Sequence, residues 1–234
     1  MISAWWTDLD APVEPHEQLL TRLTAEERAR AERLHFAADR SRWIVSRAWL
    51  RRTLGEVLAT DGAALEFARG QWGKPQLAGA HAGALEFNLS HSSSRALLAV
   101  TTRGAVGADI EAIRPMEDMR SIAERHFAAE EQRALFALPE VEQLAAFYRL
   151  WTRKEAYIKA TGTGLGHALD RFAVDERRDA ARFVHIDGDE TIARGWTLWH
   201  MELPAPKSGG DCKGFAGAIA CAAPGVEVRL MRSR

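Results

Sequence analysis

Apolar residues recur at helical spacing between Ser41 and Ala59. Their period of three to four residues predicts a long amphipathic helix with one buried face. The apolar members of this face are Trp43, Leu50, Leu54, Val57 and Leu58. Arg47 falls on the same face, so a cation stands where a core residue is expected. Ahead of this helix, Thr24 and Glu27 have the spacing of a capping box, which predicts a second helix starting there.

Short stretches of alternating apolar and polar residues follow, separated by glycine and proline. They predict strands near 63–68, 84–90, 95–101 and 105–111. In 84–90 the odd-numbered positions from 85 are apolar, while Asn88 and Ser90 share the opposite face, as a period of two requires. We therefore expect the polar face of this strand to point outward, with Ser90 and His91 at its end.

The second half of the chain repeats this order of elements. Its patterns predict helices over 117–127 and 140–160, and strands near 171–175, 181–186, 196–202 and 215–221. Each half thus offers a long helix beside a small sheet. The predicted fold is α+β, with two similar lobes related by a pseudo-twofold axis, each a small, mainly antiparallel sheet packed with a long helix. The expected division is an N-terminal lobe over 1–104 and a C-terminal lobe over 105–234.

Composition narrows the class of protein. The 234 residues are 47% hydrophobic, and 31 Lys and Arg balance 32 Asp and Glu, so no overall field favours nucleic acid or an anionic membrane as a partner. The N-terminus lacks a basic segment followed by an apolar one, and no stretch approaches the ~18 apolar residues of a membrane span. We expect a cytoplasmic protein in which Cys212 and Cys221 are reduced and structural.

Asp109 and Glu111 form the first candidate site. They lie two residues apart in the predicted strand 105–111, so both carboxylates project from one face. Such a pair suits Mg²⁺, which is commonly held by one or two carboxylates together with the phosphates of a substrate. The alternative for this pair alone is an exposed strand face without a ligand.

A second candidate lies in the long helix of the second half. Glu155 and Lys159 stand one turn apart, and Trp151 lies one turn before Glu155. As an isolated pair they would be a surface ion pair. The apolar residues around them instead indicate a mostly buried setting, where a carboxylate needs a metal or a cation as partner.

Other polar motifs are weaker when taken singly. The turn from Gly70 to Pro75 carries Gly73 and Lys74, which offer close backbone approach and a point charge to a phosphate. Ser90 and His91 lack the Gly-x-Ser-x-Gly elbow of a hydrolase. The glycines of 162–166 follow a helix and fit a helix C-terminus better than a nucleotide loop. The chain also has no zinc-binding spacing of Cys and His.

Four of these motifs in this order resemble the Sfp-type 4'-phosphopantetheinyl transferases. They are Gly73-Lys74-Pro75, Phe87 to Ser92, Gly107 to Glu111, and Trp151 to Lys159 with its Lys-Glu-Ala core. The resemblance covers about residues 24–166, and Lys-Glu-Ala after Trp is similar to one of two main subgroups of the family. The family implies a monomer that moves the phosphopantetheine arm of coenzyme A to a serine of an acyl or peptidyl carrier protein.

The resemblance implies roles for individual residues. Asp109, Glu111 and Glu155 would hold Mg²⁺ against the pyrophosphate of coenzyme A, with Lys159 nearby. The motif Gly73, Lys74 and Pro75, together with Arg42, would contact the phosphates of the nucleotide, and Ser90 and His91 would lie beside the 3'-phosphate. Arg47 is a further candidate for this pocket. Family members place basic residues in the first helix, where this chain offers only Arg28 and Arg30 beside Glu26 and Glu27.

The expected mechanism is an in-line attack by the carrier serine, which releases 3',5'-ADP. Glu155, Lys159 and Asp109 are the expected catalytic residues, and the base is either Glu155 or a metal-bound water. The carrier would bind between the lobes, where apolar residues of 116–127 form either its docking surface or ordinary helix packing. Two other functions stay open at this point: a Mg²⁺-dependent phosphohydrolase of coenzyme A or a nucleotide, and a non-catalytic coenzyme A binding module.

Overall fold

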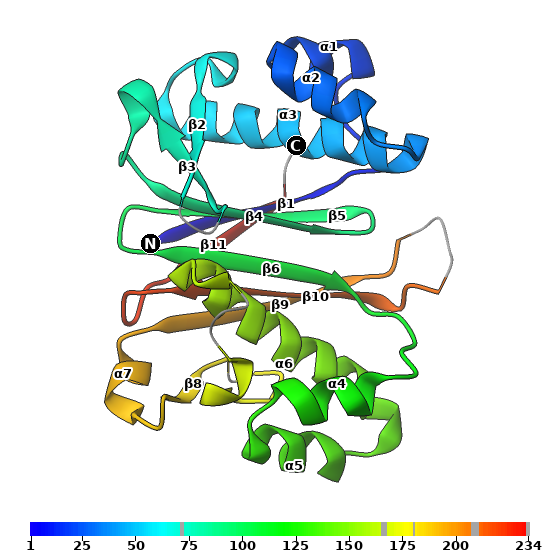
Figure 1. The fold of residues 1–234 in the computed structure, drawn as a ribbon, viewed down its shortest axis with the longest axis vertical. Helices are drawn as coiled ribbons and strands as arrows, with labels where there is room; N and C mark the ends of the chain where they lie inside the picture. Colours follow the sequence, from blue (N-terminus) through cyan, green and yellow to red (C-terminus); the bar gives the residue numbers. More distant parts are fainter. Residues whose placement is uncertain (71–72, 165–167, 180, 207–210, 233–234) are drawn as a thin grey trace.

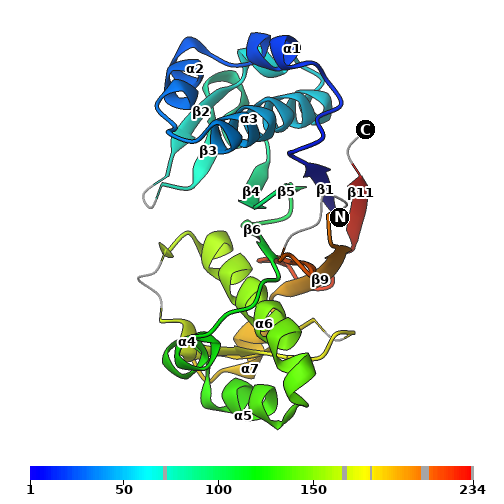
Figure 2. The same cartoon turned by 90° about the vertical axis from the view of Figure 1, so that its right-hand side faces the viewer.

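The structure is a computed structural model that describes residues 1–70, 73–164, 168–179, 181–206 and 211–232. Two lobes meet through their sheets at the centre of the molecule, and the long helices lie on the outer sides (Figures 1 and 2). The first sheet has the order β11 (Val228–Arg232), β1 (Ile2–Asp8), β5 (Arg95–Thr101) and β4 (Glu86–Ser92). The second has the order β6 (Val106–Ala112), β10 (Gly214–Cys221) and β9 (Thr197–Pro204). All pairings except that of β1 with β11 are antiparallel, so the α+β prediction with two lobes is confirmed.

The N-terminal lobe is built on the predicted long helix, α3 (Ala37–Leu58), which lies over the first sheet (Figure 1). Its buried face is broader than the predicted stripe, because Ile44, Val45, Ala48 and Trp49 are in the core while Val57 is exposed. The capping box is confirmed: the Thr24 hydroxyl accepts the Glu27 N–H, and the Glu27 carboxylate accepts the Thr24 N–H, at the start of α2 (Ala25–Glu32). The lobe is completed by α1 (His16–Thr21) and a hairpin of β2 (Glu66–Arg69) and β3 (Pro75–Ala78).

The C-terminal lobe is built on α6 (Glu140–Thr161), as predicted for 140–160. This helix packs on β6 and β10, and its other sides are covered by α4 (Met119–His126), α5 (Ala129–Ala137) and a small sheet. That sheet pairs β7 (Phe172–Val174) with β8 (Phe183–Ile186), and α7 (Glu190–Arg194) leads on to β9. Although α3 and α6 each have 22 residues, no helix in the described ranges is long and apolar enough to cross a membrane.

Two strands of the first sheet were not predicted. β1 runs antiparallel to β5 and parallel to β11, with Ile2 opposite Val228. The C-terminal strand therefore belongs to the sheet of the N-terminal lobe. The expected boundary between residues 104 and 105 lies in the connection from β5 to β6. The final strand of the segment 105–234, however, pairs with β1 in the sheet of the N-terminal lobe.

One buried histidine makes the stability of this fold sensitive to acid. Burial lowers the pKa of His200, on β9, to about 3, and the charges of Arg153 and Arg149 add to this effect. Glu202 lies 3.6 Å from the His200 ring, but its carboxylate is already paired with Arg149 at 3.5 Å and with Arg178 at 2.6 Å.

We therefore expect acid to destabilise the protein through His200. The unfolded chain takes up this proton near the ordinary pKa of 6.5 and the folded chain only near 3, so the free energy of unfolding falls as the pH is lowered between these values. The expected slope from this group is about 1.4 kcal/mol per pH unit. Urea denaturation at a series of pH values measures it. His200→Gln should remove this part of the slope, and an unchanged slope in that variant contradicts the assignment.

Candidate active site at the junction of the lobes

Backbone N–H groups along one edge of β6 donate hydrogen bonds to side chains of β4, not to the backbone of a neighbouring strand. The Asn88 Oδ1 accepts the N–H of Ala108 at 2.9 Å, and two steps on, the Ser92 Oγ accepts the N–H of Ala112 at 3.1 Å. Between them, the Ser90 Oγ lies 3.4 Å from the N of Ile110. Buried backbone N–H groups need such partners, and here polar side chains of the other lobe provide them. The prediction that this face of β4 points outward is therefore wrong: Asn88 and Ser90 are both only 6% exposed.

A glycine lets the long helix of the C-terminal lobe lie directly on β6. A Cβ at Gly107 would stand 2.0 Å from the carbonyl oxygen of Ala156 and 2.3 Å from the N of Ala160. Any larger residue would force α6 away from the strand. This close approach brings Lys159 beside Asp109, although the two lie fifty positions apart in the sequence.

Asp109, Lys159 and Ser90 form one polar cluster. The Lys159 Nζ lies 2.5 Å from the Asp109 Oδ1 and donates to the Ser90 Oγ at 3.1 Å, while the Ser90 hydroxyl donates to the Asp109 Oδ1 at 3.0 Å. Asp109 is 1% exposed, and its second oxygen, Oδ2, is buried without a hydrogen-bond partner in the described residues. A buried carboxylate oxygen without a donor is costly, so this atom favours a bound cation or donor.

Glu111 and Glu155 complete the acidic side of the site. Burial raises the pKa of Glu155, and the Asp109 charge raises it further, while Lys159 opposes the rise. Burial also raises the pKa of Glu111, with a smaller contribution from Asp109, while the hydrogen bond from Ser92 lowers it. Two carboxylates whose charge is disfavoured by that of Asp109 suit a divalent cation beside them. No three Asp, Glu, His or Cys side chains in the described ranges already form a metal-binding group, so ligation requires these side chains to move closer together.

A pocket of about 540 Å³ opens in the N-terminal lobe, and four arginines and the glutamates Glu26, Glu27 and Glu66 line it. Of the predicted nucleotide contacts it contains Arg47, Pro75 and His91. Three further arginines line it, and they are Arg30 of α2, Arg51 of α3 and Arg69 of β2. The sequence did not indicate Arg51 and Arg69 as pocket residues, because only the fold brings α2, α3 and β2 around one pocket. Partial burial, and secondarily the Lys159 charge, lower the pKa of His91, which lines this pocket.

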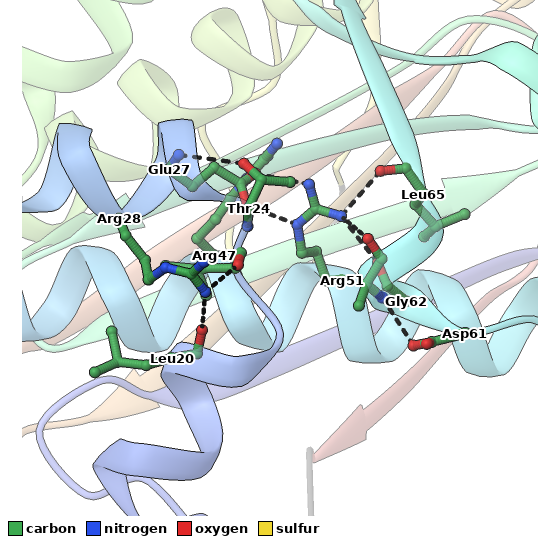
Figure 3. A network of polar contacts seen from close by, with 11 residues as sticks. Leu20, Thr24, Glu27, Arg28, Arg47, Arg51, Asp61, Gly62 and Leu65 are labelled. Carbon is green, nitrogen blue, oxygen red and sulfur yellow. Dashed lines mark hydrogen bonds and ion pairs between the residues drawn. The ribbon is translucent and has the colours of Figure 1, made fainter.

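Figure 3 shows how the wall of this pocket is held together. Glu27 of α2 accepts hydrogen bonds from Arg47 and from Arg51, the latter at 2.8 and 3.0 Å. Arg51 also donates to the carbonyl oxygens of Gly62 and Leu65, each at 2.9 Å, so it ties α2 and α3 to the start of β2. Burial opposes the charge of Glu27, yet these arginines hold the pKa of the carboxyl below its usual value. Glu27 is thus a structural partner of the predicted phosphate ligand Arg47.

The remaining basic candidates are engaged elsewhere. Lys74 follows Gly73, whose φ is +81°, and donates to the carbonyl oxygen of Val106 at 2.9 Å. Arg42 forms a two-pronged ion pair with Asp10 at 2.7 and 2.9 Å and lines a second hollow of about 200 Å³ beside His91. Arg28 donates to carbonyl oxygens in the preceding turn. Lys74 and Arg42 therefore lie apart from the lining of the larger pocket. Trp72 of the same turn, and Gly166, lie outside the described residues.

Comparisons with known proteins agree along most of the chain. Residues 105–220 match the family model of the 4'-phosphopantetheinyl transferase superfamily, and residues 10–103 match the model described as "4'-phosphopantetheinyl transferase, N-terminal". The chain is 32% identical over 207 residues to a putative 4'-phosphopantetheinyl transferase, slr0495, of Synechocystis sp., covering 88% of this chain and 82% of that protein.

Two further relatives carry the same description. The chain is 39% identical over 165 residues to the 4'-phosphopantetheinyl transferase HetI of Nostoc sp., covering 70% of each chain. It is 31% identical over 189 residues to the 4'-phosphopantetheinyl transferase Sfp of Bacillus subtilis, covering 79% of this chain and 77% of the other. The family models and these relatives together span both lobes. The chain therefore belongs to the 4'-phosphopantetheinyl transferase superfamily, whose enzymes transfer the phosphopantetheine arm of coenzyme A to a carrier protein.

Proposed function

We propose that the cluster of Asp109, Glu111, Glu155, Lys159 and Ser90 is the active site of an Sfp-type transferase. In this proposal the chain modifies a serine of an acyl or peptidyl carrier protein in a Mg²⁺-dependent reaction. The observation that carries it is the contact of Lys159 with Asp109 beside an unpartnered carboxylate oxygen. Two observations support the Sfp type: a single chain forms both lobes, and the similarity to Sfp covers 79% of this chain.

The arginine-lined pocket suits the nucleotide end of coenzyme A, and the cluster of Asp109, Glu111 and Glu155 suits its central pyrophosphate. Arg30, Arg47 and Arg69 offer cations to the phosphates of the nucleotide, and His91 lies where the pocket reaches β4. The pyrophosphate would then lie toward Lys159, whose side chain is one-third exposed and so accessible to a ligand. Arg42 is already paired with Asp10, and Lys74 donates to the carbonyl oxygen of Val106 and lies 3.5 Å from Glu86, so both would contact a phosphate in competition with these partners.

The residues of the chain have distinct tasks in the displacement. Bound Mg²⁺ would neutralise charge on the phosphate oxygens, and its ligands would be Asp109, Glu111 and Glu155. Lys159 places a second positive charge at the same position, which favours the developing negative charge of the leaving 3',5'-ADP. Glu155, whose pKa is raised by burial, would accept the proton of the carrier serine, directly or through a water.

Intact mass spectrometry tests this function and separates it from a coenzyme A hydrolase. The protein is incubated with coenzyme A, Mg²⁺ and a panel of apo carrier proteins from fatty acid, polyketide and peptide synthesis. We expect one carrier class to gain the mass of a single phosphopantetheine arm, and chelation of the metal with EDTA to prevent the gain. Consumption of coenzyme A without any gain would favour the hydrolase, and binding without consumption would favour a non-catalytic module.

A further inference from the structure

Ser92 stands at the end of β4 and contacts a carboxylate of the other lobe. Its Oγ lies 2.7 Å from the Glu111 Oε2 and 3.1 Å from the N of Ala112. A backbone N–H can only donate, so it occupies a lone pair of the hydroxyl oxygen. The single hydroxyl proton of Ser92 is thereby directed to the Glu111 carboxylate, and the short distance is typical of a bond to a charged acceptor.

The same arrangement occurs two residues earlier on both strands. The Ser90 Oγ lies beside the N–H of Ile110 and donates to Asp109, as Ser92 does for Ala112 and Glu111. Each serine of β4 therefore contacts one carboxylate of β6 and the amide that follows it. Because both strands advance by two residues between the contacts, the two carboxylates are held in register with β4.

Glu111 has particular need of such a partner. Its side chain is half-buried, and both burial and the Asp109 charge disfavour its ionised form. A glutamate also has three rotatable side-chain bonds, whose freedom must be given up to keep the carboxylate inside the cluster. Ser92 is the hydrogen-bond donor to this carboxylate in the described part of the chain. Without that bond, repulsion from Asp109 would favour rotamers that turn Glu111 toward water.

We propose that Ser92 is a positioning residue that holds Glu111 for metal binding and so makes the catalytic cluster depend on both lobes. The inference rests on the proposed metal-dependent transfer but assigns a role to a residue outside the predicted site. Hydrogen-bond partners that orient metal ligands typically change metal affinity by about 10- to 100-fold when removed. Loss of the Ser92 hydroxyl should therefore weaken metal binding, with a smaller effect on the binding of coenzyme A.

The test compares Ser92→Ala with Ser92→Thr in this protein with coenzyme A bound. Free Mn²⁺ is measured by electron paramagnetic resonance during a titration, and the free energy of unfolding is measured in urea. We expect Ser92→Ala to weaken Mn²⁺ binding by about 10-fold or more. Threonine keeps the hydroxyl and suits a strand, so Ser92→Thr should restore most of the affinity. Affinity in Ser92→Ala within twofold of the wild type would overturn the proposal.

A control and a metal-free readout keep this result separate from the fate of the proposed function. Ser94→Ala removes a buried hydroxyl of the same hairpin whose described partner is Arg95, and should leave Mn²⁺ affinity unchanged. If the wild type binds no Mn²⁺, the metal assignment fails, and crystals of Ser92→Ala decide the positioning role. A Glu111 carboxylate that keeps its wild-type position in those crystals overturns it, whereas a displaced or disordered one supports it.

Discussion

Replacing Asp109 with asparagine is expected to lower kcat by at least about 10²-fold, the scale for removing one preorganised polar group from an active site. The Asp109 carboxylate is almost fully buried and lies in contact with both Lys159 and Ser90. An amide of the same shape cannot neutralise the Lys159 ammonium, and it offers a metal a neutral oxygen in place of a charged one. The rate of carrier modification at saturating coenzyme A measures the effect.

The matched control for this variant is Asp118→Asn. Asp118 is exposed ahead of α4 and makes no side-chain cap there, so its replacement should leave kcat within twofold. The free energy of unfolding of both variants should be measured as well, because a misfolded Asp109→Asn protein would also lose activity. A stable Asp109→Asn protein that retains more than a tenth of the wild-type kcat would show that Asp109 has no catalytic role.

The largest expected change in stability follows from replacing Lys154 with methionine. Lys154 is the neighbour of Glu155 on α6 but points to a different side of the helix, where it is fully buried. Its Nζ lies 2.8 Å from the Glu131 Oε2 and donates to the carbonyl oxygens of Leu169 at 2.9 Å and Phe172 at 2.6 Å. Removing one member of a buried ion pair leaves an uncompensated charge, which costs about 3–5 kcal/mol. Urea denaturation should show a loss of this size.

Lys213→Met is the control for this change, because Lys213 is exposed and its replacement should alter stability by no more than about 0.5 kcal/mol. A double variant, Lys154→Met with Glu131→Gln, removes both charges and should lose less than the sum of the two single variants. Additive losses would mean that the two side chains do not act as a pair. The lysine of the Lys-Glu-Ala motif thus stabilises the C-terminal lobe, while the adjacent glutamate belongs to the proposed active site.

The sequence predicts well what local patterns determine. The helical period predicted α3 and α6, and the alternation of apolar residues predicted β4, β5 and β6 to within two residues. The spacing of Asp109 and Glu111 on one strand placed both carboxylates on one face of β6. Lys159 and Asp109 were expected in one site only through the family resemblance, because the contact between α6 and β6 depends on tertiary packing.

Other features could not be predicted, since they depend on partners far apart in the sequence. The polar face of β4 has the pattern of a solvated surface, but it serves the N–H groups of another strand. The sequence pattern did not predict the bonds of Arg51 to Glu27 and to carbonyl oxygens near β2. Lys74 was expected at a phosphate, yet it donates to the carbonyl oxygen of Val106. In each case the sequence shows that a polar or charged residue is present, but it does not show which distant group that residue bonds to.

The parallel pairing of β1 with β11 has a consequence for how the protein is made. A ribosome releases residues 2–8 early and residues 228–232 more than two hundred peptide bonds later, so β1 has one open edge throughout most of synthesis. An open strand edge pairs readily with other chains. The sheet of the N-terminal lobe is therefore complete only after the rest of the chain has been synthesised. We infer that the two lobes complete their folding together and not one after the other.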